Sequence, residues 1–159
     1  MVKIKNKGIS IIEVLVVISI LSIISAIVVP RLSGFRNQQV LKNTTEDIVS
    51  LLNEARNNTI SSKDSTNYGV HFESDKVVLF KGLSFESSTS NKEIKLDSSI
   101  VIPEDGGINL QNGGDDIVFE RITGDTVNDE YGTIVIQSTK DETAQNIVSI
   151  SKIGIIDSN

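Results

Sequence analysis

The chain has 159 residues, enough for one globular domain of ordinary size with a short appendage. It contains no cysteine, which excludes disulfides, a lipoprotein anchor, a cysteine-based zinc site and a thiol nucleophile. The net charge is -6. Residues 1–8 carry Lys3, Lys5 and Lys7, and their loss would leave 12 basic and 21 acidic side chains. Such an acidic surface repels nucleic acid and anionic lipid headgroups.

Residues 9–29 form an almost continuous apolar run, interrupted only by Ser10, Glu13, Ser19, Ser22 and Ser25. A helix of this length rises roughly 31 Å, close to the roughly 30 Å hydrocarbon thickness of a bilayer. Lipid selects a helix because every backbone group must be satisfied within the segment. The sequence therefore predicts a membrane-spanning helix over residues 9–30, with the preceding lysines in the cytoplasm and the rest of the chain outside it.

A conventional secretory signal is the competing interpretation of this segment, with a positive region over residues 1–7 and cleavage after Ala26. The apolar run is longer than the roughly 7–15 residues usual for such a signal, and it contains an acid. These two features favour an anchor that stays in the membrane.

Glu13 is the most informative residue of the run. A carboxylate at the centre of a bilayer costs roughly 2.5–3.5 kcal/mol on insertion scales, and the span holds no Lys, Arg or His to pair with it. Glu13 could reach the interface or bind a proton. It could also pair with a cation of another subunit.

The stretch Lys7-Gly8-Ile9-Ser10-Ile11-Ile12-Glu13-Val14-Leu15-Val16-Val17 resembles the prepilin processing motif of type IV pilins and type II secretion pseudopilins. The resemblance implies a leader over residues 1–8, cleavage after Gly8 by a prepilin peptidase and N-methylation of the new first residue, Ile9, where the family more often has Phe. It also implies that Glu13 pairs with the N-terminal amine of a neighbouring subunit. The implied partners are other pilin subunits, the peptidase and an inner-membrane assembly platform.

Pro30 stands at the end of the run. A proline removes one helical hydrogen bond and disfavours helix in the residue before it, so a kink or local unwinding is expected at Val29–Pro30. Pro30 and Arg31 could also simply end the span. The family resemblance adds that pilins commonly carry a proline at this distance from the cleavage site and often lose helicity there in the filament.

Residues 31–62 are predicted to continue as an amphipathic helix into a head domain. Apolar and small residues recur at steps of three or four: Leu41, Thr45, Ile48, Leu52, Ala55 and Thr59. This stripe should pack on a sheet, with the charged residues on the rest of the circumference. The run of serines and charges at residues 61–65 should end the helix.

Residues 63–159 are predicted to form the β-rich remainder of the head. Alternating segments with turn residues between them predict strands at Asn67–Phe72, Val77–Lys81, Glu93–Leu96, Ser99–Ile102, Ile117–Ile122, Gly132–Ser138 and Ile147–Ile156. The first two flank a turn at residues 73–76 and so form a hairpin. The fold class is therefore α+β: one long helix packed on an antiparallel sheet, which is either single or split into two layers.

The head is also similar to the GspH/FimT group of minor pseudopilins. The similarity is carried by Tyr68-Gly69-Val70-His71-Phe72 with Leu79-Phe80-Lys81-Gly82, Ile117-Val118-Phe119 with Gly124, Gly132-Thr133-Ile134-Val135-Ile136, and Ile147-Val148-Ser149-Ile150-Ser151 with Gly154. It implies a pilin-like head over most of residues 67–156.

Other candidate sites in the head are weak. Ser149 and Lys152 have the S-x-x-K spacing of serine acyl transferases, but residues three apart on a strand point to opposite faces. The only histidine, His71, alternates with Val70 and Phe72 and should be solvated. No metal ligand set is expected apart from a candidate calcium site in the late acidic loop, at Asp125, Asp129 and Glu130.

These patterns predict a minor pilin or pseudopilin, membrane-anchored before assembly, with no enzymatic activity and no cofactor. The alternative is a FimT-like subunit that binds DNA during natural transformation. Some relatives place arginines after the glycine of the last hairpin, whereas Gly154 is followed here by Ile155-Ile156-Asp157. DNA is therefore not an expected partner. A secreted β-domain released by signal peptidase would leave Glu13 and Pro30 unexplained.

Overall fold

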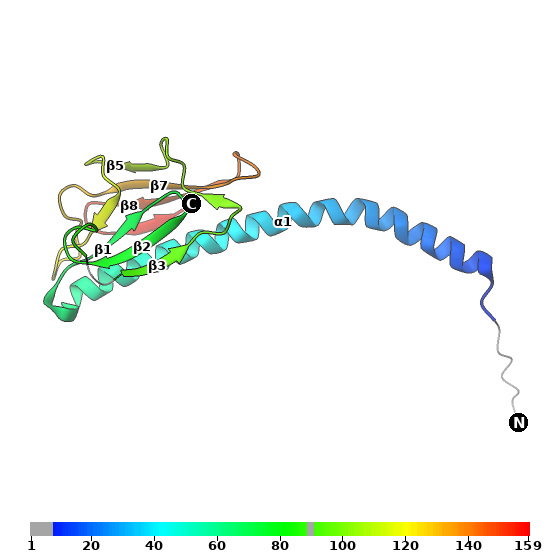
Figure 1. The fold of residues 1–159 in the computed structure, drawn as a ribbon, viewed down its shortest axis with the longest axis horizontal. Coiled ribbons are helices and arrows are strands. Elements are labelled where there is room, and N and C mark those ends of the chain that lie inside the picture. The colour runs from blue at the N-terminus through cyan, green and yellow to red at the C-terminus, as the bar shows by residue number, and fades with distance from the viewer. Residues whose placement is uncertain (1–7, 89–90) are drawn as a thin grey trace, which may run out of the picture. The chain divides into compact units, whose positions relative to one another are not determined.

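The structure is a computed structural model that describes residues 8–88 and 91–159, apart from the side chains of residues 29–33 and 91. The chain divides into two compact units, residues up to 36 and residues 37–159. One helix, α1 (Ile11–Ile60), runs through both (Figure 1). The two units are described separately below.

The first unit consists mainly of the apolar part of α1. The helix begins after Ser10, whose carbonyl accepts hydrogen bonds from the backbone N–H groups of Glu13 at 3.0 Å and Val14 at 3.3 Å. The segment Ile11–Val28 is long and apolar enough to cross a membrane, and none of it is buried within the chain. Helix continues through Pro30, so the local unwinding expected in the filament stays a prediction.

In the second unit, α1 packs through one side of its surface. All six residues of the predicted stripe are buried, together with Leu51: Leu41, Thr45, Ile48, Leu52, Ala55 and Thr59. Charged side chains occupy the exposed side, where Lys42 and Glu46 form an ion pair at 3.8 Å. The helical period of the sequence therefore predicted the packing face correctly.

The C-terminal end of α1 is fixed by a buried threonine. The Thr59 hydroxyl donates to the Ala55 carbonyl at 2.9 Å and accepts the backbone N–H of Tyr68, also at 2.9 Å. Ser62 then takes a left-handed conformation with φ of 53°, before a short 3-10 turn, η1 (Lys63–Ser65). The helix thus ends within the predicted segment, and the threonine joins it to the first strand.

The strands form two antiparallel sheets. The first has the order β3-β2-β1-β6, made of β3 (Asn91–Lys95), β2 (Lys76–Lys81), β1 (Tyr68–Phe72) and β6 (Asp116–Val118). The second has the order β4-β7-β8-β9, made of β4 (Ile100–Val101), β7 (Gly132–Ser138), β8 (Gln145–Ile150) and β9 (Ile156–Ser158), with β5 (Ile108–Leu110) also paired to β7. The expected first hairpin is present, with Phe72 opposite Val77.

The core lies where the α1 stripe meets residues of both sheets. Its fully buried members include Ile48 and Leu52 from the helix, Val70 from β1, and Ile134 and Ile136 from β7. Figure 1 shows the strands layered over the last turns of α1. The predicted α+β architecture of a helix packed on antiparallel strands is therefore confirmed, and the strands are divided between two sheets.

Three strand predictions need correction. The strand expected at Ile117–Ile122 ends at Val118, and Ile122 lies in a turn with φ of 78°. The strand expected at Ile147–Ile156 is two strands, β8 and β9, because Gly154 turns the chain with φ of 71° and the Ser151 N–H donates to the Ile155 carbonyl at 2.9 Å. The short strand β5 lies in a segment where no strand was predicted.

Candidate functional site

The predicted cleavage site lies in an accessible part of the chain. Gly8 and Ile9 are exposed and precede the helix. A Cβ atom added to Gly8 would meet no other atom within 4 Å. The packing of the described residues therefore does not require a glycine at this position.

Glu13 lies in the first turn of α1, where the helix dipole favours a negative charge. It shares a shallow groove on the helix surface with apolar neighbours, Ile9, Val14, Val17 and Ile18. Glu13 and Val17 are four residues apart on the helix, which places them on one face. Among the residues that the structure describes, no cation pairs with the Glu13 carboxylate.

Two serine side chains of the apolar helix are satisfied locally. The hydroxyl of Ser19 donates to the Leu15 carbonyl at 2.7 Å, and that of Ser22 donates to the Ile18 carbonyl at 2.7 Å. Such bonds hide the hydroxyl from lipid at little cost. Glu13 is the one charged side chain of the span Ile11–Val28. No ion-pair partner for it lies in residues 8–88 or 91–159.

The acidic residues named as calcium candidates do not come together as a site. Asp129 forms an ion pair with Lys152 at 3.0 Å, and Glu130 turns into the head, where it accepts the backbone N–H of Val118 at 2.6 Å. Within residues 8–88 and 91–159, no group of three or more His, Asp or Glu side chains is placed to hold a metal ion. Asp125, Asp129 and Glu130 thus have separate structural environments.

His71 is partly buried, so the expectation of a solvated histidine is wrong. Its ring stacks on Phe85 with a centroid distance of 4.1 Å, and its Nδ1 lies 2.6 Å from Oδ1 of Asp116. The loop after β2 brings Phe85 over this outer face of the first sheet, where Phe85 also contacts Phe80 edge to face. The histidine is part of the packing that holds this loop to the sheet.

The S-x-x-K pair is not a catalytic dyad. Ser149 is exposed on β8, and the Lys152 ammonium is paired with Asp129. Lys152 lies in the turn after β8, so the argument that both residues lie on one strand does not apply to this pair.

The N-terminal residues 3–29 match the model of the prokaryotic N-terminal methylation motif. No curated protein sequence matches the chain. Among solved structures, the type IV minor pilin FimU of Pseudomonas aeruginosa is similar at 14% identity and a TM-score of 0.58, covering 75% of this chain and 92% of FimU. The minor pseudopilin EpsH of the Vibrio cholerae type 2 secretion system is similar at 15% identity and a TM-score of 0.53, covering 75% of this chain and 95% of EpsH.

The head of this chain therefore has the fold of these minor pilin and pseudopilin structures. The methylation motif lies on the apolar helix, and the pilin-like fold accounts for the head. Three quarters of the chain is covered in each structural comparison, so the resemblance first seen at Gly8, Glu13 and Pro30 extends to the architecture of the whole head. The predicted resemblance to type IV pilins and pseudopilins is confirmed for the motif and for the fold.

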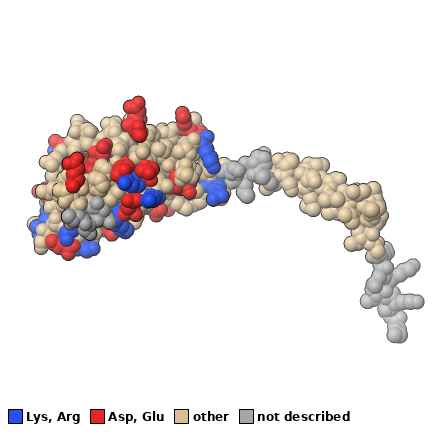
Figure 2. Space-filling model, viewed as in Figure 1, with Lys and Arg blue, Asp and Glu red and all other residues tan. Residues whose placement is uncertain are grey.

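The surface of this pilin-like head is acidic. Residues 1–36 contain five of the 15 Lys and Arg residues and one of the 21 Asp and Glu residues. The head therefore has ten basic and 20 acidic residues. Figure 2 shows acidic side chains spread over the visible face of the head. A cleft lined by three lysines breaks this pattern, and sequence reasoning missed it because its residues lie far apart in the chain.

Proposed function

We propose that this chain is a minor subunit of a type IV pilus or of a type II secretion pseudopilus, and that it enters the filament through its N-terminal helix. The observation that carries the proposal is the apolar segment Ile11–Val28, whose side chains find no cover in the chain itself. Lipid covers such a helix before assembly, and the helices of neighbouring subunits cover it afterwards.

Processing precedes assembly in this proposal. A prepilin peptidase cuts between Gly8 and Ile9 and methylates the Ile9 amine. The exposed, non-helical backbone at this bond supports access by a protease. Before assembly the chain is a single-pass membrane protein with its head outside the cytoplasm, and an assembly platform in the inner membrane extracts it.

Glu13 acts in the transfer from membrane to filament. Its carboxylate has no partner within the described residues, and a charge in lipid is costly. The amine that cleavage creates at Ile9 of a neighbouring subunit is a cation at the depth where Glu13 needs one. Pairing of the two groups would favour docking of the incoming subunit over its return to the bilayer.

The region after Gly154 weighs against DNA binding. Ile153 and Ile155 are both more than half exposed, and the next residues are Ile156 and Asp157. The loop therefore presents apolar and acidic groups where nucleic acid binding needs cations. Assembly is the better supported function.

Co-expression of the full chain with a prepilin peptidase and a pilus or pseudopilus assembly system tests the proposal. The mature protein should begin at Ile9, as read by N-terminal sequencing, and should appear in the sheared filament fraction. A mature protein beginning at Ile27 would instead identify a signal peptidase product and refute the proposal.

A further inference from the structure

Four exposed isoleucines form a patch at the end of the head where α1 ends. The isoleucine patch consists of Ile60, the last residue of α1, Ile122 in the loop after β6, and Ile153 and Ile155 in the turn between β8 and β9. The three loop residues are each more than half exposed. Among the described residues of the head, Leu83 is the only other large apolar side chain that is exposed. The exposed apolar surface of the head is therefore concentrated in this patch.

Close backbone contacts hold the parts of the patch together. A Cβ atom added to Gly124 would lie 2.6 Å from Cδ1 of Ile60, so Ile60 packs directly against the loop that carries Ile122. The same loop is bonded to the turn between β8 and β9, because the Thr126 N–H donates to the Lys152 carbonyl at 3.0 Å. The end of α1 and the two loops therefore form one continuous surface.

Ile122 has a conformation that its side chain disfavours. Its φ is 78°, in the left-handed region where a β-branched residue is an outlier. The other non-glycine residues with positive φ, among those that the structure describes, are serine, aspartate and asparagine. The fold gains little packing from Ile122, because the residue is 80% exposed. A strained and uncovered apolar residue favours a role in binding over a role in folding.

Arg56 lies beside the patch, one helical turn before Ile60. Its Nε donates to the Gly124 carbonyl at 3.1 Å. Within residues 8–88 and 91–159 the guanidinium forms no ion pair, although the Gly124 loop carries Glu120 and Asp125. Arg56 is half-buried, so a partner that covers the patch removes more water from this charge and must bring an acceptor for it. The patch thus fits an apolar surface that carries a carboxylate.

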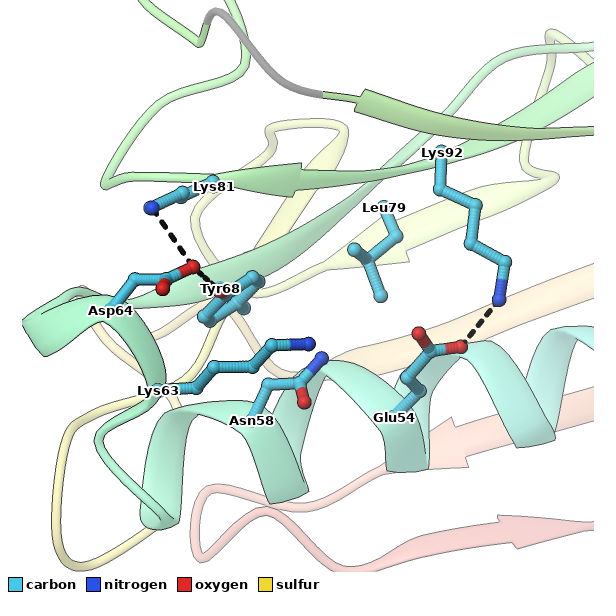
Figure 3. A pocket seen from close by; sticks show the side chains of 8 residues that line it. All are labelled: Glu54, Asn58, Lys63, Asp64, Tyr68, Leu79, Lys81 and Lys92. Atoms are coloured by element: carbon cyan, nitrogen blue, oxygen red, sulfur yellow. Dashed lines mark hydrogen bonds and ion pairs between the residues drawn. The ribbon is translucent and has the colours of Figure 1, made fainter.

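The lysine cleft, which lies between the end of α1 and the first sheet, has no such need. Figure 3 shows that Glu54 pairs with Lys92 and that Asp64 pairs with Lys81, at 2.6 and 3.0 Å. The third lysine of the cleft, Lys63, is exposed, so water solvates its charge. Arg56 has neither a counterion in the described chain nor full access to water, which favours the patch as the surface that a partner completes.

The position of the patch distinguishes a second copy from a different subunit. The head begins at Asn37, and Ile60 lies roughly 35 Å further along α1 by the rise per residue. An end-to-end contact of two patches would point the two Asn37 residues in opposite directions, which two copies anchored in one membrane cannot do. A contact of the patch with another face of a second copy would repeat from copy to copy, which does not suit a minor subunit.

We propose that the isoleucine patch docks the head of a different pilin-like subunit of the same filament, through an apolar face with a carboxylate that pairs with Arg56. Docking would cover the strained Ile122 and give the half-buried charge of Arg56 a counterion. The inference rests on the proposed function, because it takes the partner from the same filament.

Pairwise co-purification in detergent tests the contact. The full chain is co-expressed with each of the other pilin-like subunits of its assembly system, one at a time, and the bound fraction is measured. At least one of them should bind the parent chain. Ile122→Asn should lower this binding about tenfold or more, as loss of a central apolar contact does, and Ile155→Asn should act in the same direction.

The melting temperature separates binding from folding. Asparagine tolerates a positive φ, so Ile122→Asn should raise the melting temperature of the head by a few degrees while it weakens binding. An isoleucine that the fold requires would give the opposite shift. Val101→Asn is the control and should bind like the parent, because Val101 pairs with Gln137 at the end of β7 opposite to the β8–β9 turn.

Arg56→Gln tests the charge. The glutamine amide nitrogen takes the place of the arginine Nε and can still donate to the Gly124 carbonyl, so the variant keeps this bond and loses the charge. Binding of the partner subunit should fall several-fold at an unchanged melting temperature. Equal binding by the parent and this variant would contradict the pairing with a carboxylate.

Three results would overturn the proposal as a whole. The parent could bind no other pilin-like subunit, or Ile122→Asn could bind as well as Val101→Asn. The parent could also self-associate in micelles by sedimentation and lose this association on Ile122→Asn, which would identify a second copy as the occupant. Filament incorporation of the parent is scored separately, so a failed contact and a failed proposed function give different results.

Discussion

The Glu130 carboxylate accepts the backbone N–H of Val118 at 2.6 Å, at the outer edge of β6. The residue is only 7% exposed. Burial and the nearby negative charge of Asp116 raise the pKa of Glu130 to about 7, although the bond from Val118 acts in the opposite direction. β6 pairs with β1 along one edge, and the Glu130 carboxylate accepts the Val118 N–H on the other edge, where β1 offers no partner.

This burial predicts a pH-dependent stability of the head. The folded state holds the Glu130 proton more tightly than the unfolded state, so its stabilising contribution is complete below about pH 4.5 and is lost as the pH rises through about 7. The loss is about 3 kcal/mol at most, since a tenfold change in proton affinity is about 1.4 kcal/mol. Thermal unfolding of the full chain in micelles, followed by circular dichroism at pH 5 and pH 8, measures it.

Glu130→Gln should remove this pH dependence, because the amide is neutral and its oxygen can still accept the Val118 N–H. Relative to the parent, the variant should gain stability between pH 5 and pH 8. An equal pH dependence in both proteins would show that another group is responsible.

Glu13 should matter for assembly and not for folding. Glu13→Leu should insert and be cleaved normally while its filament-to-membrane ratio falls, because the variant cannot pair with a neighbouring amine. Glu13→Gln keeps the shape without the charge and should show much of the same defect. Glu46→Gln, at an exposed acid of the head helix, is the control. Normal incorporation of both Glu13 variants would rule out the pairing, provided that a head-domain pull-down shows no recruitment through the head.

Processing should depend on the size of residue 8. Gly8→Val should block cleavage, whereas Gly8→Ala is small enough to be cut, and both should leave the head unchanged because nothing packs on this glycine. Gly34→Val is the matched control, since that position is also free of contacts within 4 Å. Immunoblots for precursor and mature forms give the result, and a mature Gly8→Val protein would exclude the expected peptidase.

The head should fold without the anchor. Residues 37–159 form their own compact unit, and the Leu41 to Thr59 stripe is buried against their own sheets. A chain of these residues should be soluble and show helix, strand and a cooperative melt by circular dichroism. A disordered or aggregated product would mean that the apolar part of α1 is needed to complete the fold.

Gly154 should tolerate no side chain. Its φ is 71°, and an added Cβ would lie 1.9 Å from the Gly124 carbonyl oxygen and 2.8 Å from Nε of Arg56. Gly154→Ala should cost more than about 1 kcal/mol of stability, since strain and a clash add. Gly106→Ala separates the two, because its φ is 72° and its surroundings are open. Equal melting temperatures for the two variants would assign the cost to strain alone.

Periodicity explains how much of this fold could be predicted. The buried helix face and the first hairpin follow from local spacing, as shown by Ile48, Leu52 and the pairing of Phe72 with Val77. The strand expected through Gly154 failed because the flanking isoleucines continue the alternating pattern while the glycine reverses the chain. Alternation also placed His71 on the outer face correctly, but could not show that Phe85 covers that face.

The candidate sites divide in the same way. Gly8, Ile9, Glu13 and Pro30 form a local pattern, so sequence alone could single them out. Lys63, Lys81 and Lys92 belong to three different elements, and only the packing of η1, β2 and β3 against α1 brings them to one cleft. The burial of Glu130 is likewise a tertiary effect. It could not be predicted from the sequence, because the acidic neighbours of Glu130 are typical of a solvated loop.

The buried stripe of α1 also determines how the head bears mechanical load. Tension that reaches Asn37 along the helix acts on the contacts from Leu41 to Thr59 together, because these residues lie in one line parallel to the pull. The interface is then loaded in shear, so its contacts must slip together, and the helix cannot be peeled away one turn at a time. A head held in this way can stay folded while force passes through its anchor.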